Sequence, residues 1–165
     1  MVQLDEYLNR LKKWKDEQVI KVITGIRRCG KSTLLTMYQQ ELLTQGVGAD
    51  QIIYINFEEL EYEELLDYKK LYNYVKARLH PEKTTYIFLD EIQQVEGFQK
   101  AVDSLYVKPG VDLYITGSNA YLLSTEFSTL LSGRYVEIRM LPLSFKEFLT
   151  FYSFDQSVTL EEKFQ

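Results

Sequence analysis

The chain has 165 residues, the length of one ordinary domain, and its 45% apolar and 26% charged residues are typical of a folded globular protein. Its 19 basic and 24 acidic residues give a formal net charge of −5, which argues against a domain whose main task is to grip a nucleic-acid backbone, although a local basic patch stays open. One cysteine and one histidine exclude a disulfide framework and a multi-histidine metal site.

Residues 1–18 are charged throughout and lack the apolar stretch of a secretory signal. No apolar run approaches the roughly 20 residues that span a bilayer. We therefore expect a cytoplasmic protein with no membrane partner.

The apolar pattern alternates between helical and strand periodicity along the chain. It predicts helices over 3–15, 31–45, 65–79, 98–105 and 123–131. Between them it predicts strands over 19–24, 52–57, 86–89, 112–116 and 135–140, the last of them a half-exposed edge strand. Strands that alternate with helices of this length predict a parallel α/β sheet with helices on both faces.

A glycine-rich loop follows the first predicted strand. Residues 25–32, GIRRCGKS, match the G-x-x-x-x-G-K-[ST] pattern at each fixed position, with the required strand before and helix after. Glycines let successive N–H groups face inward around an anion, and the helix N-terminus adds positive partial charge. We expect Lys31 on the β- and γ-phosphates of ATP and Ser32 on Mg²⁺. The full set of expected nucleotide-binding residues is Gly25, Arg28, Cys29, Gly30, Lys31, Ser32 and Thr33.

Cys29 has two interpretations. The first, which we favour, is a solvent-facing residue that occupies a variable position of the loop without a specific role. The second is a reactive thiol whose pKa is lowered by neighbouring basic residues and the helix N-terminus.

Two carboxylates follow the third predicted strand, in the sequence YIFLDE of residues 86–91. Ligand sites in open α/β sheets lie at the carboxyl ends of the strands, so this pair should lie beside the phosphate loop. Asp90 would hold Mg²⁺ through water, and Glu91 would orient or deprotonate the attacking water. Taken alone, the pattern also fits a strand end followed by a helix cap.

Two further polar positions lie at strand ends. Ser118 and Asn119 follow the fourth strand, and we expect one of them, preferably Asn119, to sense the γ-phosphate; the alternative is a helix cap. Arg134 precedes the fifth strand on the rim of the domain. Its guanidinium suits a developing phosphoryl charge on a neighbouring subunit, and the alternative is a surface salt bridge.

Together these stretches resemble the AAA-domain ATPases of bacteria and archaea that are often fused to a C-terminal domain of unknown function. GIRRCGKSTLL, YIFLDEIQ, ITGSNAYLL and LLSGRYVEIRMLPLSFKEF occur in this order. The resemblance implies a P-loop fold of the ASCE type with strand order 5-1-4-3-2. It also implies a catalytic Glu91, a sensor at Asn119 or Ser118, and an arginine finger at Arg134.

We expect one domain over residues 1–165, with an N-terminal helix in 1–18 and a nucleotide-binding core in 19–150. Capping boxes at Ser144–Glu147 and Thr159–Glu162 each begin a helix, and the second leaves almost no chain to continue it. Residues 151–165 therefore indicate the start of a truncated C-terminal region; the alternative is a frayed chain end.

The function that these residues favour is hydrolysis of ATP with Mg²⁺, coupled to a C-terminal domain of the same parent chain and weak in the isolated domain. The alternatives are a P-loop kinase and a nucleotide-binding switch without turnover. The Asp-Glu pair and the few arginines after the fourth strand favour the ATPase. The expected partners are ATP or ADP and further copies of the chain, and nucleic acid stays open.

Overall fold

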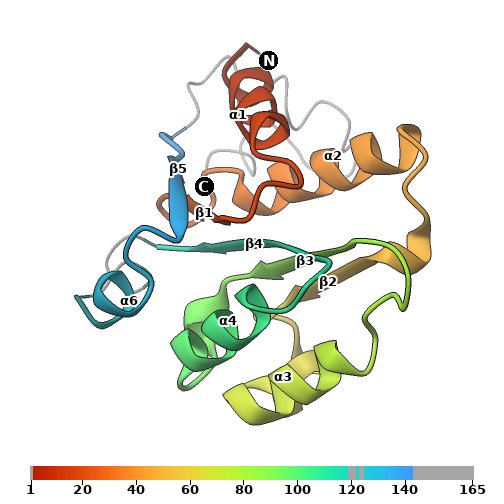
Figure 1. Ribbon diagram of the computed structural model, residues 1–165. Coiled ribbons are helices and arrows are strands. Elements are labelled where there is room, and N and C mark those ends of the chain that lie inside the picture. Colours follow the sequence, from red (N-terminus) through yellow and green to blue (C-terminus); the bar gives the residue numbers. More distant parts are fainter. Residues whose placement is uncertain (1, 119–121, 123–124, 143–165) are drawn as a thin grey trace.

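The computed structural model describes residues 2–118, 122 and 125–142 (Figure 1). Their strands form one parallel sheet in the order β2-β3-β4-β1-β5. The strands are β1 (Ile20–Thr24), β2 (Ile52–Asn56), β3 (Thr85–Asp90), β4 (Val111–Gly117) and β5 (Tyr135–Arg139). The predicted α/β class and strand order are both confirmed.

Helices cover both faces of the sheet (Figure 1). On one face lie α1 (Val2–Lys13) and α2 (Lys31–Thr44). On the other lie α3 (Tyr68–Lys76) and α4 (Phe98–Tyr106), with the short α6 (Thr125–Leu130) beside β5. Single 3-10 turns are η1 (Ala49–Gln51), η2 (Leu60–Leu65) and η3 (Ile92–Gln94).

The helix predicted over 65–79 begins later than its apolar stripe suggests. Leu65 belongs to the 3-10 turn η2, and the helix starts after Asp67, whose side chain accepts a hydrogen bond from the backbone N–H of Lys70 at 3.1 Å. This side-chain cap satisfies one of the free N–H groups at the helix start and so sets the boundary.

Some sequence expectations fall outside the described residues. These are Asn119, the two predicted capping boxes and the predicted C-terminal region 151–165.

Two hydrophobic layers enclose the central strands, which is why β1 and β3 are buried along their whole length. One layer packs between the sheet and α3, α4 and α6, and the other between the sheet and α1 and α2. At the edge of the sheet, β5 alternates buried Ile138 with exposed Glu137 and Arg139, as predicted for an edge strand.

The end of the sheet opposite the glycine-rich loop contains a buried ion pair. The Lys21 ammonium on β1 donates to the carboxylate of Asp112 on β4 and to the backbone carbonyl of Glu17, and both charged side chains are almost completely buried. Tyr114 also donates to Asp112, at 2.8 Å. Because each charge has a partner and hydrogen bonds, burial there is tolerated.

Parallel strands place all their carboxyl ends at one edge, and the loops after β1, β3 and β4 meet there. This edge carries Lys31, Ser32, Asp90 and Glu91. Among the described residues, no helix is long and apolar enough to cross a membrane.

Candidate nucleotide site

The loop between β1 and α2 depends on its two glycines. Gly30 has φ 103°, in the left-handed region that favours glycine, and it immediately precedes the first residue of α2. A Cβ atom on Gly25 would lie 2.5 Å from the Cys29 sulfur and 3.0 Å from the Met140 carbonyl oxygen. The pattern therefore needs glycine at both positions, once for the backbone conformation and once for close packing.

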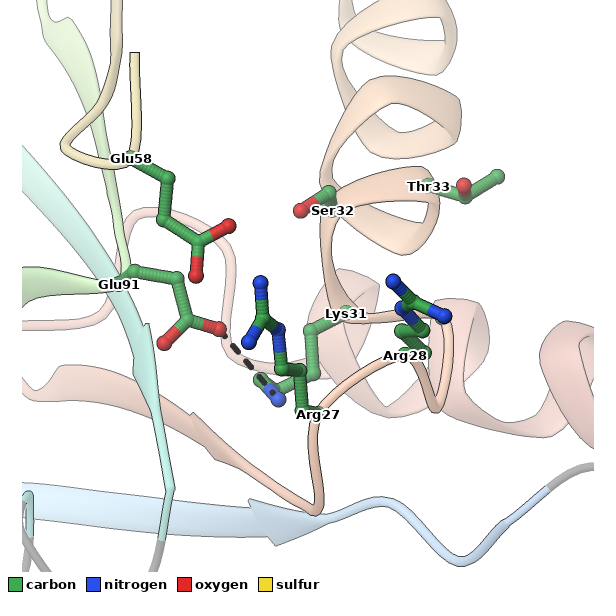
Figure 2. Close-up of a pocket in the computed structure, with 8 residues that line it drawn as sticks. Arg27, Arg28, Lys31, Ser32, Thr33, Glu58 and Glu91 are labelled. Carbon is green, nitrogen blue, oxygen red and sulfur yellow. Dashed lines mark ion pairs between the residues drawn. The ribbon is translucent and has the colours of Figure 1, made fainter. Parts of the chain in front are cut away.

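Lys31 lies inside the curve of this loop and is 4% exposed. Its ammonium donates to the carbonyl oxygens of Gly25 at 3.0 Å and Ile26 at 2.9 Å. It also forms an ion pair with Glu91 at 3.5 Å, drawn as the dashed line in Figure 2. The two motifs predicted from the sequence are thus joined through their most characteristic side chains.

Glu91 has a left-handed backbone conformation, φ 59° and ψ 49°, which is uncommon for a residue with a side chain. Its N–H donates to the Thr116 hydroxyl at 2.9 Å, and its carboxylate accepts a hydrogen bond from Gln93 at 2.6 Å. Glu91 is the N-cap residue of η3, as the helix-cap interpretation expected, but its side chain makes no capping hydrogen bond. Such conformations cost about 1–3 kcal/mol and collect at functional sites.

Asp90 is fully buried and both of its oxygens accept hydrogen bonds from hydroxyl groups. Thr116 on β4 donates to one oxygen at 2.6 Å, and Tyr54 on β2 donates to the other at 2.7 Å. Burial, and then the adjacent Asp90 carboxylate, raise the pKa of Tyr54, while a hydrogen bond with the Ser32 side chain lowers it. Tyr54 therefore lies between Asp90, to which it donates, and Ser32, the two residues expected to hold Mg²⁺.

These residues fit a magnesium ion that is bound together with a nucleotide. Mg²⁺ takes oxygen ligands and keeps several waters, and proteins usually supply one or two side chains while the substrate supplies phosphate oxygens. Ser32 and Asp90 match that contribution. In the part of the chain that the structure describes, no group of three or more histidine, cysteine or acidic side chains could hold a metal by itself.

A cleft of about 350 Å³ opens between the loop and the end of β3, within the range of small-molecule sites. In Figure 2 the Arg27 side chain extends toward Glu58 and Glu91, while Thr33 points to the other side of the helix. The residues that line the cleft are Arg27, Arg28, Gly30, Lys31, Ser32, Thr33, Glu58 and Glu91.

Three residues of the site were not predicted from the sequence: Glu58, Tyr54 and Thr116. Glu58 comes two residues after β2, at the same sheet edge as the predicted pair, and this position is the signal that would have found it. The two hydroxyl residues lie within strands and carry no comparable motif.

A second, more apolar cleft of about 310 Å³ lies on the other side of Gly25 and Ile26. Met140, Leu141 and Pro142, which follow β5, form much of its wall. Ser118 also lines it, and the buried hydroxyl oxygen of Ser118 has no hydrogen-bond partner among the described residues. The predicted sensor segment thus begins next to the phosphate loop.

Both interpretations of the Cys29 side chain are wrong. Cys29 is 1% exposed and packs in the hydrophobic layer beneath α1 and α2, together with Met140. Burial, the largest effect, raises the pKa of its thiol, although Lys31 acts in the opposite direction. The loop folds its variable position inward, so the thiol is neither solvent-facing nor activated, and its side chain does not line the cleft.

Arg134 lies at the opposite end of the sheet from the phosphate loop. Its carbonyl accepts a hydrogen bond from Ile20, the first residue of β1, whereas the loop follows the last. Its guanidinium pairs with Asp103 on α4 at 3.0 Å, and both side chains are substantially exposed. The surface ion pair expected as the alternative is present, and Arg134 is too far to reach its own cleft.

A family model of the AAA domain matches residues 17–149. The chain belongs to the AAA domain family. An uncharacterized protein of Haemophilus influenzae is 46% identical over 164 residues, which are 99% of this chain and 41% of that protein. An uncharacterized protein of Methanocaldococcus jannaschii is 40% identical over 138 residues, 82% of this chain and 29% of that protein. The chain therefore spans less than half the length of these curated relatives.

Solved AAA+ structures share the fold. Cdc6p from Pyrobaculum aerophilum superposes with a TM-score of 0.61 at 13% identity, covering 92% of this chain and 47% of that one. A chain of the Drosophila origin recognition complex bound to DNA superposes with a TM-score of 0.59 at 16% identity. The superposition covers 87% of this chain and 95% of that one. Hsp104 in a closed state with ATPγS superposes with a TM-score of 0.58 at 16% identity. The superposition covers 90% of this chain and 28% of that one. The family and these folds support a nucleotide-binding ATPase module.

Proposed function

We propose that this chain binds ATP with Mg²⁺ and hydrolyses it to ADP and phosphate. The observation that carries the proposal is the ion pair between Lys31 and Glu91 at one edge of the sheet, where Ser32 lies in the first turn of α2 and Asp90 ends β3. The residues 25–32 that curl around Lys31 offer N–H groups to phosphate, and the cleft beside them has room for it.

Each side chain has a distinct task in this mechanism. Lys31 exchanges its contacts with loop carbonyls and Glu91 for the β- and γ-phosphates, and this exchange releases the carboxylate. Glu91 then accepts a proton from the attacking water. The water oxygen bonds to the γ-phosphorus, the bond to the β–γ bridging oxygen breaks, and ADP leaves with its electron pair. Ser32 and Asp90 would hold Mg²⁺, which would neutralise negative charge on the phosphates.

The cycle is proposed to act on a further domain of the same polypeptide. The support is the length of the curated relatives, of which this chain spans 41% and 29%. Oligomeric assembly and a cytoplasmic location belong to the same proposal.

Binding is tested by thermal unfolding with Mg–ADP. A ligand at a hundredfold excess over Kd stabilises the folded state by about 2.7 kcal/mol, which raises the Tm of a domain of this size by roughly 5–11 °C. Lys31→Ala should abolish that shift relative to its own ligand-free Tm, whereas Lys83→Ala, an exposed lysine outside the cleft, should keep it. Equal shifts in both variants would remove Lys31 from phosphate binding.

Turnover is tested by phosphate release without any acceptor, which also separates the ATPase from a kinase. Glu91→Gln should bind nucleotide like the wild type but release no phosphate, because an amide does not accept the water proton. Asp90→Ala should instead weaken the Mg²⁺ dependence of binding. Wild-type phosphate release by Glu91→Gln would contradict the assigned role.

A further inference from the structure

The outer sides of α3 and α4 concentrate positive charge on a chain whose net charge is −5. Residues 68–78 contain four basic residues and no acidic one, and α4 and its end add two lysines. We call this the α3–α4 surface; its basic residues are Lys69, Lys70, Lys76, Arg78, Lys100 and Lys108. It covers the face of the sheet opposite α2, away from the phosphate loop (Figure 1).

Tyrosine rings are interleaved with these cations. Two ammonium groups lie over the ring of Tyr68, those of Lys100 at 5.1 Å and Lys69 at 5.8 Å from the centroid. The Tyr72 ring is approached in the same way, by Lys108 at 5.4 Å and Lys76 at 6.0 Å. Both rings pack against the core with one side and stay half-buried, so they are held in place by the fold.

A groove of about 200 Å³ runs between the two helices, and no acidic side chain lines it. Its lining combines two aromatic rings, two lysines, two small polar side chains and one alanine: Tyr68, Tyr72, Lys69, Lys100, Asn73, Ser104 and Ala101. A groove with this lining can accept a flat apolar group while the lysines neutralise negative charge next to it.

The acidic side chains near the groove either have hydrogen-bond or ion-pair partners or lie outside its lining. Asp67 caps α3, and Asp103 is paired with Arg134. Glu96 is exposed and precedes the first residue of α4. The glutamates of η2 precede α3, so they mark the end of the basic surface on that side. The lysines over the two rings therefore contact tyrosine and solvent rather than carboxylate groups of the described residues.

The combination of rings and cations selects among polyanions. An acidic peptide would use the lysines but leave the tyrosine rings without a function. Single-stranded nucleic acid uses both, because phosphates pair with lysines while unstacked bases stack on aromatic rings. We propose that the α3–α4 surface binds single-stranded nucleic acid, with phosphates at Lys69, Lys76 and Lys100 and bases against Tyr68 and Tyr72.

The test is fluorescence anisotropy of a labelled 20-nucleotide oligo(dT) at 50 mM salt. The double variant Lys69→Glu/Lys100→Glu should weaken binding at least tenfold. It should also flatten the slope of log affinity against log salt, by about 0.7 for each phosphate that is no longer neutralised. The matched control Lys12→Glu/Lys13→Glu makes the same charge change on α1, across the sheet, and should alter affinity less than threefold. Equal losses in both doubles, or no binding by the wild type, would overturn the proposal.

Stacking is tested at Tyr72. Tyr72→Phe keeps the ring and should bind within twofold of wild type, whereas Tyr72→Leu keeps apolar packing but loses the ring and should bind roughly 5- to 100-fold more weakly. If Tyr72→Leu does not fold, the exposed lysine variants still decide the question.

Two competitors identify the class of partner. Polyglutamate or duplex DNA that binds as tightly as oligo(dT), without sensitivity to Tyr72→Leu, would assign the surface to an acidic protein segment or to a duplex and refute the proposal. Lys31→Ala should bind oligo(dT) like the wild type, so the outcome does not depend on whether the chain hydrolyses ATP.

Discussion

Replacing Thr116 by valine, which has nearly the same shape, should remove two hydrogen bonds at once. One holds the Asp90 carboxylate and the other holds the backbone of Glu91. The Thr116 hydroxyl donates to Asp90 at 2.6 Å and accepts from the N–H of Glu91 at 2.9 Å. Thr116 and Asp90 are both fully buried, so water cannot replace either bond without opening the fold. The same hydroxyl therefore holds the carboxylate proposed to bind Mg²⁺ and the strained backbone of the residue proposed as catalytic base.

The expected cost follows from these two bonds. A hydrogen bond to a charged acceptor contributes about 1.5–3 kcal/mol, and a buried N–H left without an acceptor costs about 1–3 kcal/mol. Thr116→Val should therefore lower the free energy of unfolding by about 4 kcal/mol, and the Tm of a domain of this size by roughly 8–16 °C. Thr116→Ser keeps the hydroxyl and loses one buried methyl, a loss of about 1 kcal/mol.

Urea unfolding of the wild type and both variants at neutral pH measures the difference. Thr116→Val should also reduce the rate of phosphate release more than it reduces nucleotide affinity, because the backbone N–H of Glu91 loses its hydrogen-bond acceptor. If valine and serine reduce stability equally, the Thr116 hydroxyl does not hold the Asp90 carboxylate and the Glu91 backbone in place.

Two further predictions concern buried ionisable groups. Burial raises the thiol pKa of Cys29, so iodoacetamide at pH 8 should label it at least about 100-fold more slowly in the native protein than in guanidinium chloride; comparable rates would mean that the loop opens readily. Burial, the largest cause in each case, also raises the pKa values of Tyr38, Tyr54, Tyr86 and Tyr114 above the ordinary tyrosine value near 10, so the folded state retains these protons. The resulting stabilisation is complete below about pH 10 and falls as the pH rises further; urea midpoints at pH 8, 9.5 and 11 should show this decline, and Tyr86→Phe should make it shallower.

The sequence predicted what depends on strand order and strand ends. Strands that alternate with helices lie parallel, and parallel strands bring their carboxyl ends to one edge. Lys31, Ser32, Asp90 and Glu91 could therefore be placed in one site from their positions after the first and third strands. The ion pair between Lys31 and Glu91 is the structural outcome of that placement.

What could not be predicted depends on register and on contacts between distant segments. Tyr54 and Thr116 reach Asp90 because β2 and β4 flank β3 in a particular register, with Asn56 opposite Asp90 and Ile115 opposite Leu89. Cys29 is buried because Met140, at the far end of the described chain, packs in the same layer. No local pattern contains such information, which is why Cys29 was placed in solvent.

The role proposed for Arg134 requires a second copy of the chain. Arg134 pairs with Asp103, and their side chains are 46% and 33% exposed. Exposed pairs contribute about 0–1 kcal/mol, so Arg134→Ala and Asp103→Ala should both fold. If the pair is all that Arg134 provides, the two variants should hydrolyse ATP equally well, because each breaks the same ion pair.

We predict instead that the two variants differ. An arginine that reaches the nucleotide of a neighbouring subunit contributes about 10³–10⁵ in rate, so Arg134→Ala should lose phosphate release while Asp103→Ala, which frees the arginine, should keep it. Such an arrangement also makes turnover rise steeply with protein concentration. Mixing Arg134→Ala subunits with Glu91→Gln subunits should restore part of the activity that neither has alone, since each supplies what the other lacks at a shared interface. Equal activity of the two alanine variants, or a mixture that stays inactive, would leave Arg134 as a surface residue that pairs with Asp103.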